Sequence, residues 1–157
     1  MSRRHASIAE LVPHAGSMLL IGDVLEHSPE RTRCRVDVAR SALFRRDDGR
    51  VPAWVGLEYM AQCVAAHGGL VSRGLGESPR PGLFLGTRRT VFRVESFAPE
   101  EELRVTARHL RGDLGLVSFA CTLERPGAAE PAAEGNVSVY VVERIEELAG
   151  GAVRGPA

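Results

Sequence analysis

The sequence contains no lysine: all twenty of its basic residues are arginine, and twenty acidic residues balance them to a formal net charge of zero. Without lysine, the chain cannot form a lysine Schiff base or the P-loop that grips a nucleotide phosphate. Without net positive charge, it has no overall field to attract nucleic acid or an anionic membrane. These absences exclude lysine-based catalysis and charge-driven binding of nucleic acid or membrane.

Cysteine and signal-peptide features are also scarce. The three cysteines, Cys34, Cys63 and Cys121, form no CxxC or CxxH pair, so we expect neither a zinc site nor a disulfide framework. Arg3 and Arg4 near the N-terminus are not followed by the apolar segment of a secretory signal. A reducing, cytoplasmic location is therefore expected.

The most apolar stretch runs from residue 51 to residue 72 and is long enough to span a bilayer. It contains Glu58, Gln62 and His67, which are costly in lipid, and a Gly68-Gly69 pair. We therefore interpret it as a buried helix of a water-soluble domain and expect no membrane span.

With 157 residues and 16.9 kDa, the chain fits a single domain over residues 1–157. The Ser7-to-Glu10 capping pattern and Pro13 predict a short helix at 7–13. Residues 30–39 alternate between apolar and charged positions, as a half-buried antiparallel strand does. The remaining patterns predict strands at 18–26, 83–97, 103–110, 114–124 and 137–141, a tight connection at 111–113, a loop at 41–50, and a loose tail at about 145–157.

The long helix, predicted at about 53–73 with Gly74 as its C-cap, is apolar on nearly every side. Such a helix must be covered on nearly every side, either by a sheet or by a second subunit. The order of elements therefore predicts an α+β fold in which an antiparallel sheet wraps around one central helix.

Three residues stand out as candidates for chemistry. Glu58 is the only residue with a formal charge between Arg50 and Arg73, and a carboxyl group on a buried helix is costly unless it is paired or functional. Gln62 lies one turn further on the same helix face, where it can hydrogen-bond that carboxyl. His14 follows Pro13 and precedes an apolar strand. Taken alone, Glu58 could be a structural residue and His14 a surface one.

Two segments together resemble a known family. Leu11-Val12-Pro13-His14 and the apolar run at 18–24 resemble the N-terminal signature of hotdog-fold 3-hydroxyacyl-acyl carrier protein dehydratases. The segment 52–62, PAWVGLEYMAQ, resembles the helix motif of that family, in which a glutamate precedes Met-Ala-Gln. Shorter matches follow in the same order at 82–86, 91–93 and 133–137. The resemblance is strongest to the predicted dehydratases of aryl polyene and related polyene lipid clusters.

The resemblance implies a dimeric hotdog fold with active sites at the subunit interface, where His14 of one subunit meets Glu58 of the other. His14 would be the general base, and Glu58, kept protonated by its apolar helix, the general acid. Gln62 would support Glu58, and the backbone amides of Ala53 and Trp54 at the positive end of the helix would polarise the thioester carbonyl. Two departures stand out: Pro52-Ala53 replaces the family's Pro-Gly, and the stretch 48–52 replaces its His-Phe-Pro segment.

The implied activity removes water from a 3-hydroxyacyl thioester to give a trans-2-enoyl thioester, in polyene or fatty-acid-like biosynthesis, with no metal or cofactor. The implied partners are acyl carrier protein and a second subunit, in a homodimer or in a heterodimer with a dehydratase-like chain. Candidates for carrier-protein contact are Arg88, Arg89 and Arg93; candidates for lining an acyl tunnel are Trp54, Met60, Phe84 and Phe92. A hotdog acyl thioesterase and a weakly active partner subunit of a heterodimer remain as alternatives.

Overall fold

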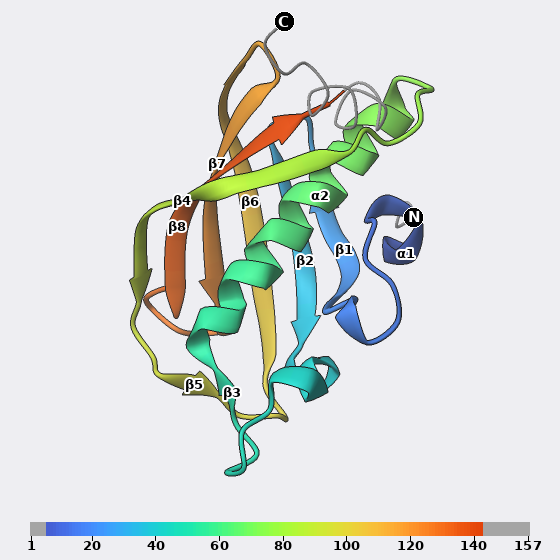
Figure 1. Cartoon of the computed structure of the whole chain (residues 1–157). Coiled ribbons are helices and arrows are strands. Elements are labelled where there is room, and N and C mark those ends of the chain that lie inside the picture. Colours follow the sequence, from blue (N-terminus) through green and yellow to red (C-terminus); the bar gives the residue numbers. More distant parts are fainter. Residues whose placement is uncertain (1–5, 143–157) are drawn as a thin grey trace, which may run out of the picture.

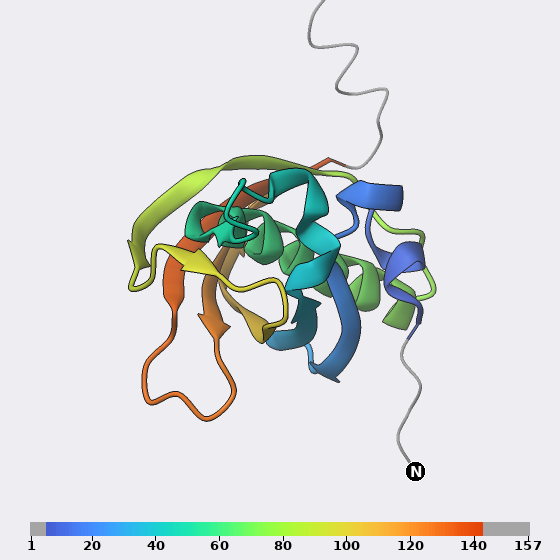
Figure 2. The same ribbon diagram turned by 90° about the horizontal axis from the view of Figure 1, so that it is seen from below.

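The computed structural model of the chain describes residues 6–142 and shows a curved antiparallel sheet around one long helix. Six strands pair in the order β1-β2-β6-β7-β8-β4, and every pairing is antiparallel. Helix α2 lies in the hollow of this sheet (Figure 1), and the view from below shows strand β4 curling over it (Figure 2). The strands of the sheet are β1 (Ile21–His27), β2 (Arg31–Asp37), β4 (Gly82–Phe92), β6 (Glu102–Asp113), β7 (Leu116–Glu124) and β8 (Ala133–Val141).

Shorter elements connect the ends of the sheet and the helix. Helix α1 (Ile8–Leu11) and the 3-10 turn η1 (Gly16–Met18) precede β1, and the 3-10 segment η2 (Val38–Phe44) follows β2. Two short strands, β3 (Val51–Pro52) and β5 (Ser96–Phe97), pair with each other, and the 3-10 turn η3 (Ala53–Val55) leads into α2 (Gly56–Gly74). The α+β, hotdog-type arrangement expected from the sequence is confirmed.

The core lies between α2 and the concave face of the sheet. Tyr59, Met60 and Cys63 of α2 are fully buried, as are Cys34 and Val36 of β2. The alternation along residues 30–39 is therefore confirmed, with the apolar side chains facing the helix. Cys63 and His67 of α2 are also buried in the core.

The N-terminal helix and the first strand are both shorter than predicted. The helix ends at Leu11, because Val12 precedes Pro13 and adopts the extended backbone that a residue before proline favours (φ −116°, ψ 150°). The apolar stretch from Met18 does not enter the sheet until Ile21, since Gly16–Met18 form a 3-10 turn.

Other boundaries also differ from those expected. The predicted strand 83–97 is two strands in different sheets, β4 and β5, and the loop at 41–50 begins with the 3-10 residues of η2. The β6–β7 hairpin turns at Leu114 and Gly115, whose φ values of 50° and 84° allow a tight two-residue turn, and not at 111–113. Helix α2 continues through Gly74, so Leu75 is its C-cap.

Within residues 6–142, no helix combines the length and the apolarity needed to cross a membrane. The predicted loose tail at about 145–157 lies outside the described residues.

Candidate active site

The structure brings the two principal candidates into direct contact. The Nε2 atom of His14 lies 3.0 Å from Oε1 of Glu58, and the two side chains are 27% and 34% exposed. Both residues belong to the same chain, and the expected pairing of His14 with Glu58 of another subunit stays a prediction. The carboxyl group is also half-exposed in this chain, whereas a buried one was expected.

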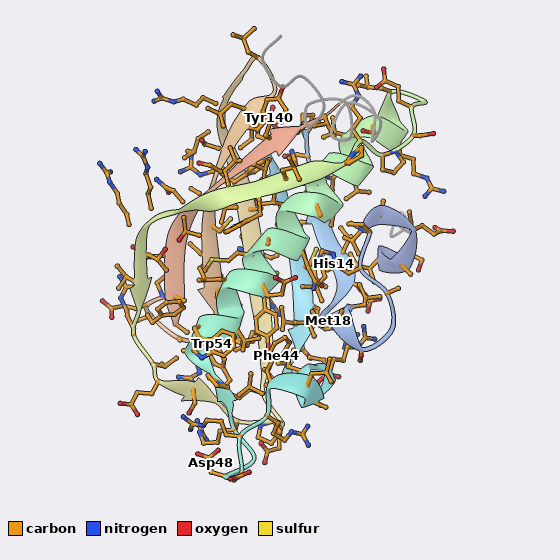
Figure 3. All side chains as sticks on the ribbon, in the orientation of Figure 1. His14, Met18, Phe44, Asp48, Trp54 and Tyr140 are labelled. Carbon is orange, nitrogen blue, oxygen red and sulfur yellow. The ribbon has the colours of Figure 1, made fainter. Side chains whose placement is uncertain are left out.

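Packing of the N-terminal segment on α2 explains why the pair forms within one chain. Helix α1 packs against α2, and a Cβ atom built on Gly69 would lie only 2.6 Å from the carbonyl oxygen of Leu11. The absence of that Cβ therefore allows close backbone contact. Figure 3 shows His14 and Met18 beside the same stretch of α2.

Gln62 connects this segment to the helix and to Glu58. Its amide nitrogen donates to the carbonyl oxygen of Met18 (2.7 Å) and to Oε1 of Glu58 (3.1 Å). Its amide oxygen accepts from the backbone N–H of Leu20 (2.9 Å) and, more weakly, of Ile21 (3.4 Å). The predicted contact between Gln62 and Glu58 is therefore present, whereas no sequence pattern indicated the backbone partners.

In each side chain of the His14–Glu58 pair, one polar atom has a partner and the other has none among the described residues. Glu58 is held through Oε1, and its Oε2 atom makes no hydrogen bond within residues 6–142. The Nδ1 atom of His14 is buried and has no partner in that part of the chain. Among the described residues, the contact with Glu58 therefore orients the imidazole of His14. Oε2 of Glu58 is left to hydrogen-bond a bound molecule, as an acceptor or, when protonated, as a donor.

The start of α2 differs from expectation at one position. The N–H of Ala53 donates to the carbonyl oxygen of Glu95 (2.9 Å), extending the β3–β5 pairing, so it cannot polarise a thioester as predicted. The N–H of Trp54 has no acceptor among the described residues. Trp54 is therefore the remaining candidate of the two amides.

The four candidates for an acyl tunnel lie in two different environments. Met60 is fully buried and packs in the core. Trp54, Phe84 and Phe92 are 57%, 52% and 38% exposed, and the Trp54 ring stands edge-on to Phe44 at 6.0 Å between centroids. In the single chain, these three side chains are surface residues, and Trp54 and Phe44 lie together near the start of α2 (Figure 3).

The three candidate arginines also separate. Arg93 donates to Glu134 (3.2 Å) and to the carbonyl oxygen of Pro131 (3.2 Å), so it is a structural residue in this chain. Arg88 and Arg89 are exposed on β4 and form no ion pair within residues 6–142. They are the two that can meet an acidic partner.

The loop that replaces the family's His-Phe-Pro segment does not approach the pair. Arg46 forms an ion pair with Asp48 (2.7 Å), and Nε of Arg50 donates to Oγ of Ser96 (2.6 Å). Asp48 lies at the tip of this loop, far from His14 (Figure 3). The histidine of the site therefore comes from the N-terminal segment.

The role of Gly69 was not identified from the sequence. A glycine within a helical pattern can also indicate a close backbone contact, and Gly69 makes such a contact with Leu11.

The imidazole of His14, the carboxyl of Glu58 and the amide of Gln62 form one group. A proton can pass between Nε2 of His14 and Oε1 of Glu58, which are in contact.

Comparison with known proteins identifies the family of this chain. The model of the ApeP-like family, described as ApeP dehydratase, matches residues 6–150. No curated protein matches the sequence.

Solved structures show the same fold. The dehydratase heterocomplex ApeI:P from Xenorhabdus doucetiae contains a chain with a TM-score of 0.88 and 24% identity, covering 96% of this chain and 100% of that one. A hypothetical thioesterase with coenzyme A from Streptococcus pneumoniae TIGR4 has a TM-score of 0.57 and 10% identity, covering 76% and 84%. Zebra fish thioesterase superfamily member 2 has a TM-score of 0.59 and 14% identity, covering 86% and 91%. Because the family model spans nearly the whole chain, this protein belongs to the ApeP-like dehydratase family, which confirms the assignment made from its motifs.

Proposed function

We propose that this dehydratase removes water from a 3-hydroxyacyl thioester carried on acyl carrier protein and forms a trans-2-enoyl thioester in polyene or fatty-acid-like biosynthesis. The observation that supports this most directly is the 3.0 Å contact between His14 and Glu58 in a chain of a dehydratase family. An imidazole titrates near neutral pH, so it can take the α-proton, while a protonated carboxyl can supply the proton for the leaving hydroxyl.

The proton balance closes within the pair. Nε2 of His14 takes the α-proton, the carbon–oxygen bond to the β-hydroxyl breaks, and Glu58 protonates that hydroxyl so that it leaves as water. The double bond forms between the α and β carbons. The imidazolium then returns its proton to the carboxylate across the 3.0 Å contact, which restores the starting state without a proton from solvent.

Two further groups fit this reaction. The N–H of Trp54 at the start of α2 would donate to the thioester oxygen as negative charge develops there, helped by the positive end of the helix dipole. Arg88 and Arg89 on β4 would contact the acidic surface of the carrier protein, since both are exposed.

The exposed strand β4 could also bind a second subunit. Leu83, Phe84 and Leu85 are between 41% and 56% exposed on β4, which is an edge strand of the sheet. An apolar edge strand favours pairing with another chain. Because the similar structure from Xenorhabdus doucetiae is a dehydratase heterocomplex, we propose a dehydratase-like partner for this edge.

The test is substitution of the two candidate residues. His14→Ala and Glu58→Ala should each fold and associate as the wild type does, but lose dehydration by a factor on the order of a hundred or more, because each removes one half of the proton exchange. Formation of the conjugated enoyl thioester from carrier-bound 3-hydroxyacyl substrate, followed by mass spectrometry, measures this.

The same samples distinguish the alternatives. Release of free carrier-protein thiol by the wild type, without enoyl product, would indicate a thioesterase. Full dehydration by either variant would show that the assignment of the pair is wrong. A wild-type chain that dehydrates only when mixed with a dehydratase-like partner would indicate a partner subunit.

A further inference from the structure

We propose that the turn between β6 and β7, with the apolar side chains beside it, inserts into the headgroup region of a phospholipid bilayer. This surface, the hairpin patch, consists of Leu114, Leu116 and Tyr140, all of which are exposed. The turn lies at one end of the molecule (Figure 1), and Figure 3 labels Tyr140 there. Membrane contact of this kind is separate from the proposed dehydration and can be tested without substrate.

The hairpin patch interrupts the polar character of the outer face of the sheet. Leu116 of β7 pairs with Tyr140 of β8, which pairs with Leu83 of β4, and all three side chains are exposed. The next outward-facing pair is Ser118 with Ser138, as expected for the solvent side of an antiparallel sheet. A contiguous apolar surface that the chain leaves exposed marks contact with another molecule or with a membrane.

Leu114 is an unusual residue for the turn that it occupies. Its φ of 50° lies in the left-handed region, which asparagine and glycine adopt more readily than leucine. Its side chain is 90% exposed, so it adds little to the packing of the fold. The ring of Tyr140 lies beside the turn, since a Cβ atom on Gly115 would be 3.1 Å from its Cε2 atom. A bulky residue held in a costly conformation without burial supports a role in binding.

Two exposed arginines lie behind the hairpin patch at the depth of lipid phosphates. Arg111 pairs with Ser118, one outward-facing row from Leu116, and Arg108 pairs with Ala120, one row further. Such rows are about 7 Å apart, and each headgroup layer of a bilayer is about 5–7 Å thick. Leu116 at the hydrocarbon boundary would therefore place Arg111 among the phosphates. Neither arginine forms an ion pair within residues 6–142.

This layered order favours a bilayer over a protein as the occupant. Leucine at the tip, tyrosine beside it and arginine behind it match the sequence of hydrocarbon, interface and phosphate in a membrane surface. A protein partner would need a flat area of roughly 800 Å², whereas the hairpin ends in a two-residue turn.

Charge contributes little to this contact. The hairpin residues 108–116, RHLRGDLGL, contain two arginines and one aspartate, which leave a formal charge of +1, and the whole chain is neutral. Insertion of the apolar side chains must therefore supply most of the affinity, while the arginines orient the protein on the surface.

Flotation with vesicles tests the proposal on the full chain, alone and with a dehydratase-like partner. One set of vesicles is phosphatidylcholine, and the other also contains phosphatidylglycerol. We expect wild type to float with both, and several-fold better with the anionic vesicles. Inorganic phosphate should not compete, because it offers charge without hydrocarbon. Binding to anionic vesicles alone that phosphate abolishes would contradict apolar insertion.

The double variant L114N/L116T removes the two leucines and keeps the local backbone preferences, since asparagine suits a positive φ and threonine suits a strand. Leu43→Asn is the matched control: Leu43 is exposed in η2, next to Phe44, which Figure 3 shows well away from Tyr140. We expect flotation of the double variant to fall at least on the order of tenfold. The control should float as wild type does.

A fluorescent probe locates the contact directly. The variants L114C and L43C are each labelled with a polarity-sensitive dye, and the native cysteines are buried and so protected from the label. We expect vesicles to raise and blue-shift the emission of the dye at position 114, with no change at position 43.

Four results would overturn the proposal. These are absence of wild-type flotation with either vesicle, equal flotation of the double variant and wild type, loss of flotation by Leu43→Asn alone, and an unchanged emission at position 114. If the double variant floats normally but loses association with a dehydratase-like partner in sedimentation velocity, the hairpin patch is a protein contact. Dehydration by a wild-type chain that does not float would refute membrane contact and leave the proposed function intact.

Discussion

At the scale of single residues, the buried polar side chains Thr32 and His67 are satisfied by hydrogen bonds within the core. Oγ1 of Thr32 lies 2.8 Å from Nδ1 of both His27 and His67. One hydroxyl has one proton, so when both imidazoles are neutral one Nδ1 accepts from Thr32 and the other donates to it. Burial, the main cause, and the neighbouring His27 and His109 lower the pKa of His67 from 6.5 to about 4.

This lowered pKa predicts acid sensitivity. Between pH 6.5 and about 4, the unfolded chain binds a proton at His67 that the folded chain does not, so the free energy of unfolding falls as pH falls through this window. Neutral His67 contributes fully to the free energy of unfolding above pH 6.5. Loss of that contribution at low pH lowers the free energy of unfolding by about 3 kcal/mol.

Denaturant unfolding of wild type and His67→Leu at several pH values measures this contribution. Other titrating groups affect both proteins equally, so they drop out of the difference between the two free energies of unfolding. We expect wild type to lose stability relative to the variant as pH falls. A constant difference between the two proteins would contradict the assignment to His67.

At the scale of elements, the approach of α1 to α2 depends on one glycine. Gly69→Ala would place a Cβ atom 2.6 Å from the carbonyl oxygen of Leu11, which is backbone and cannot rotate away. We expect the free energy of unfolding to fall by about 1–3 kcal/mol and dehydration to fall as well, because the segment containing His14 must shift.

The adjacent residue provides the control for Gly69→Ala. A Cβ atom on Gly68 meets nothing within 4 Å, so Gly68→Ala should raise stability by roughly 0.5–1 kcal/mol through its helix propensity and leave activity unchanged. Thermal or denaturant unfolding with the enoyl assay measures both. Equal behaviour of the two variants would show that close packing at Gly69 is unimportant.

At the scale of the whole molecule, the sheet leaves an apolar edge at β4. We expect Leu85→Glu to weaken association with a second subunit at least on the order of tenfold, because it places a charge in the contact. Leu85 is 56% exposed in the single chain, so the variant should fold normally.

Leu25→Glu is the matched control, since Leu25 is 41% exposed on β1 at the opposite edge of the sheet. Sedimentation velocity of each chain, alone and with a dehydratase-like partner, measures the effect. Weakened association of Leu25→Glu, with none for Leu85→Glu, would place the interface elsewhere.

Local sequence patterns were enough to predict the central helix, most of the strands and the identity of the candidate residues. Alternation along 31–37 and the apolar surface of α2 reflect periodicities of the backbone, which depend only on neighbouring residues. The Pro-His and Glu-x-x-x-Gln positions were also readable, because short motifs keep their spacing along the chain. The contact between Gln62 and Glu58 followed from the helical period alone.

Which distant groups meet depends on how the whole chain folds. His14 contacts Glu58 of its own chain because Gly69 and Gln62 hold the N-terminal segment, and the amide of Ala53 is occupied because β5 brings the carbonyl of Glu95 beside it. Such partners are set by packing and by the need to satisfy buried polar groups across the whole fold, and no local period encodes them.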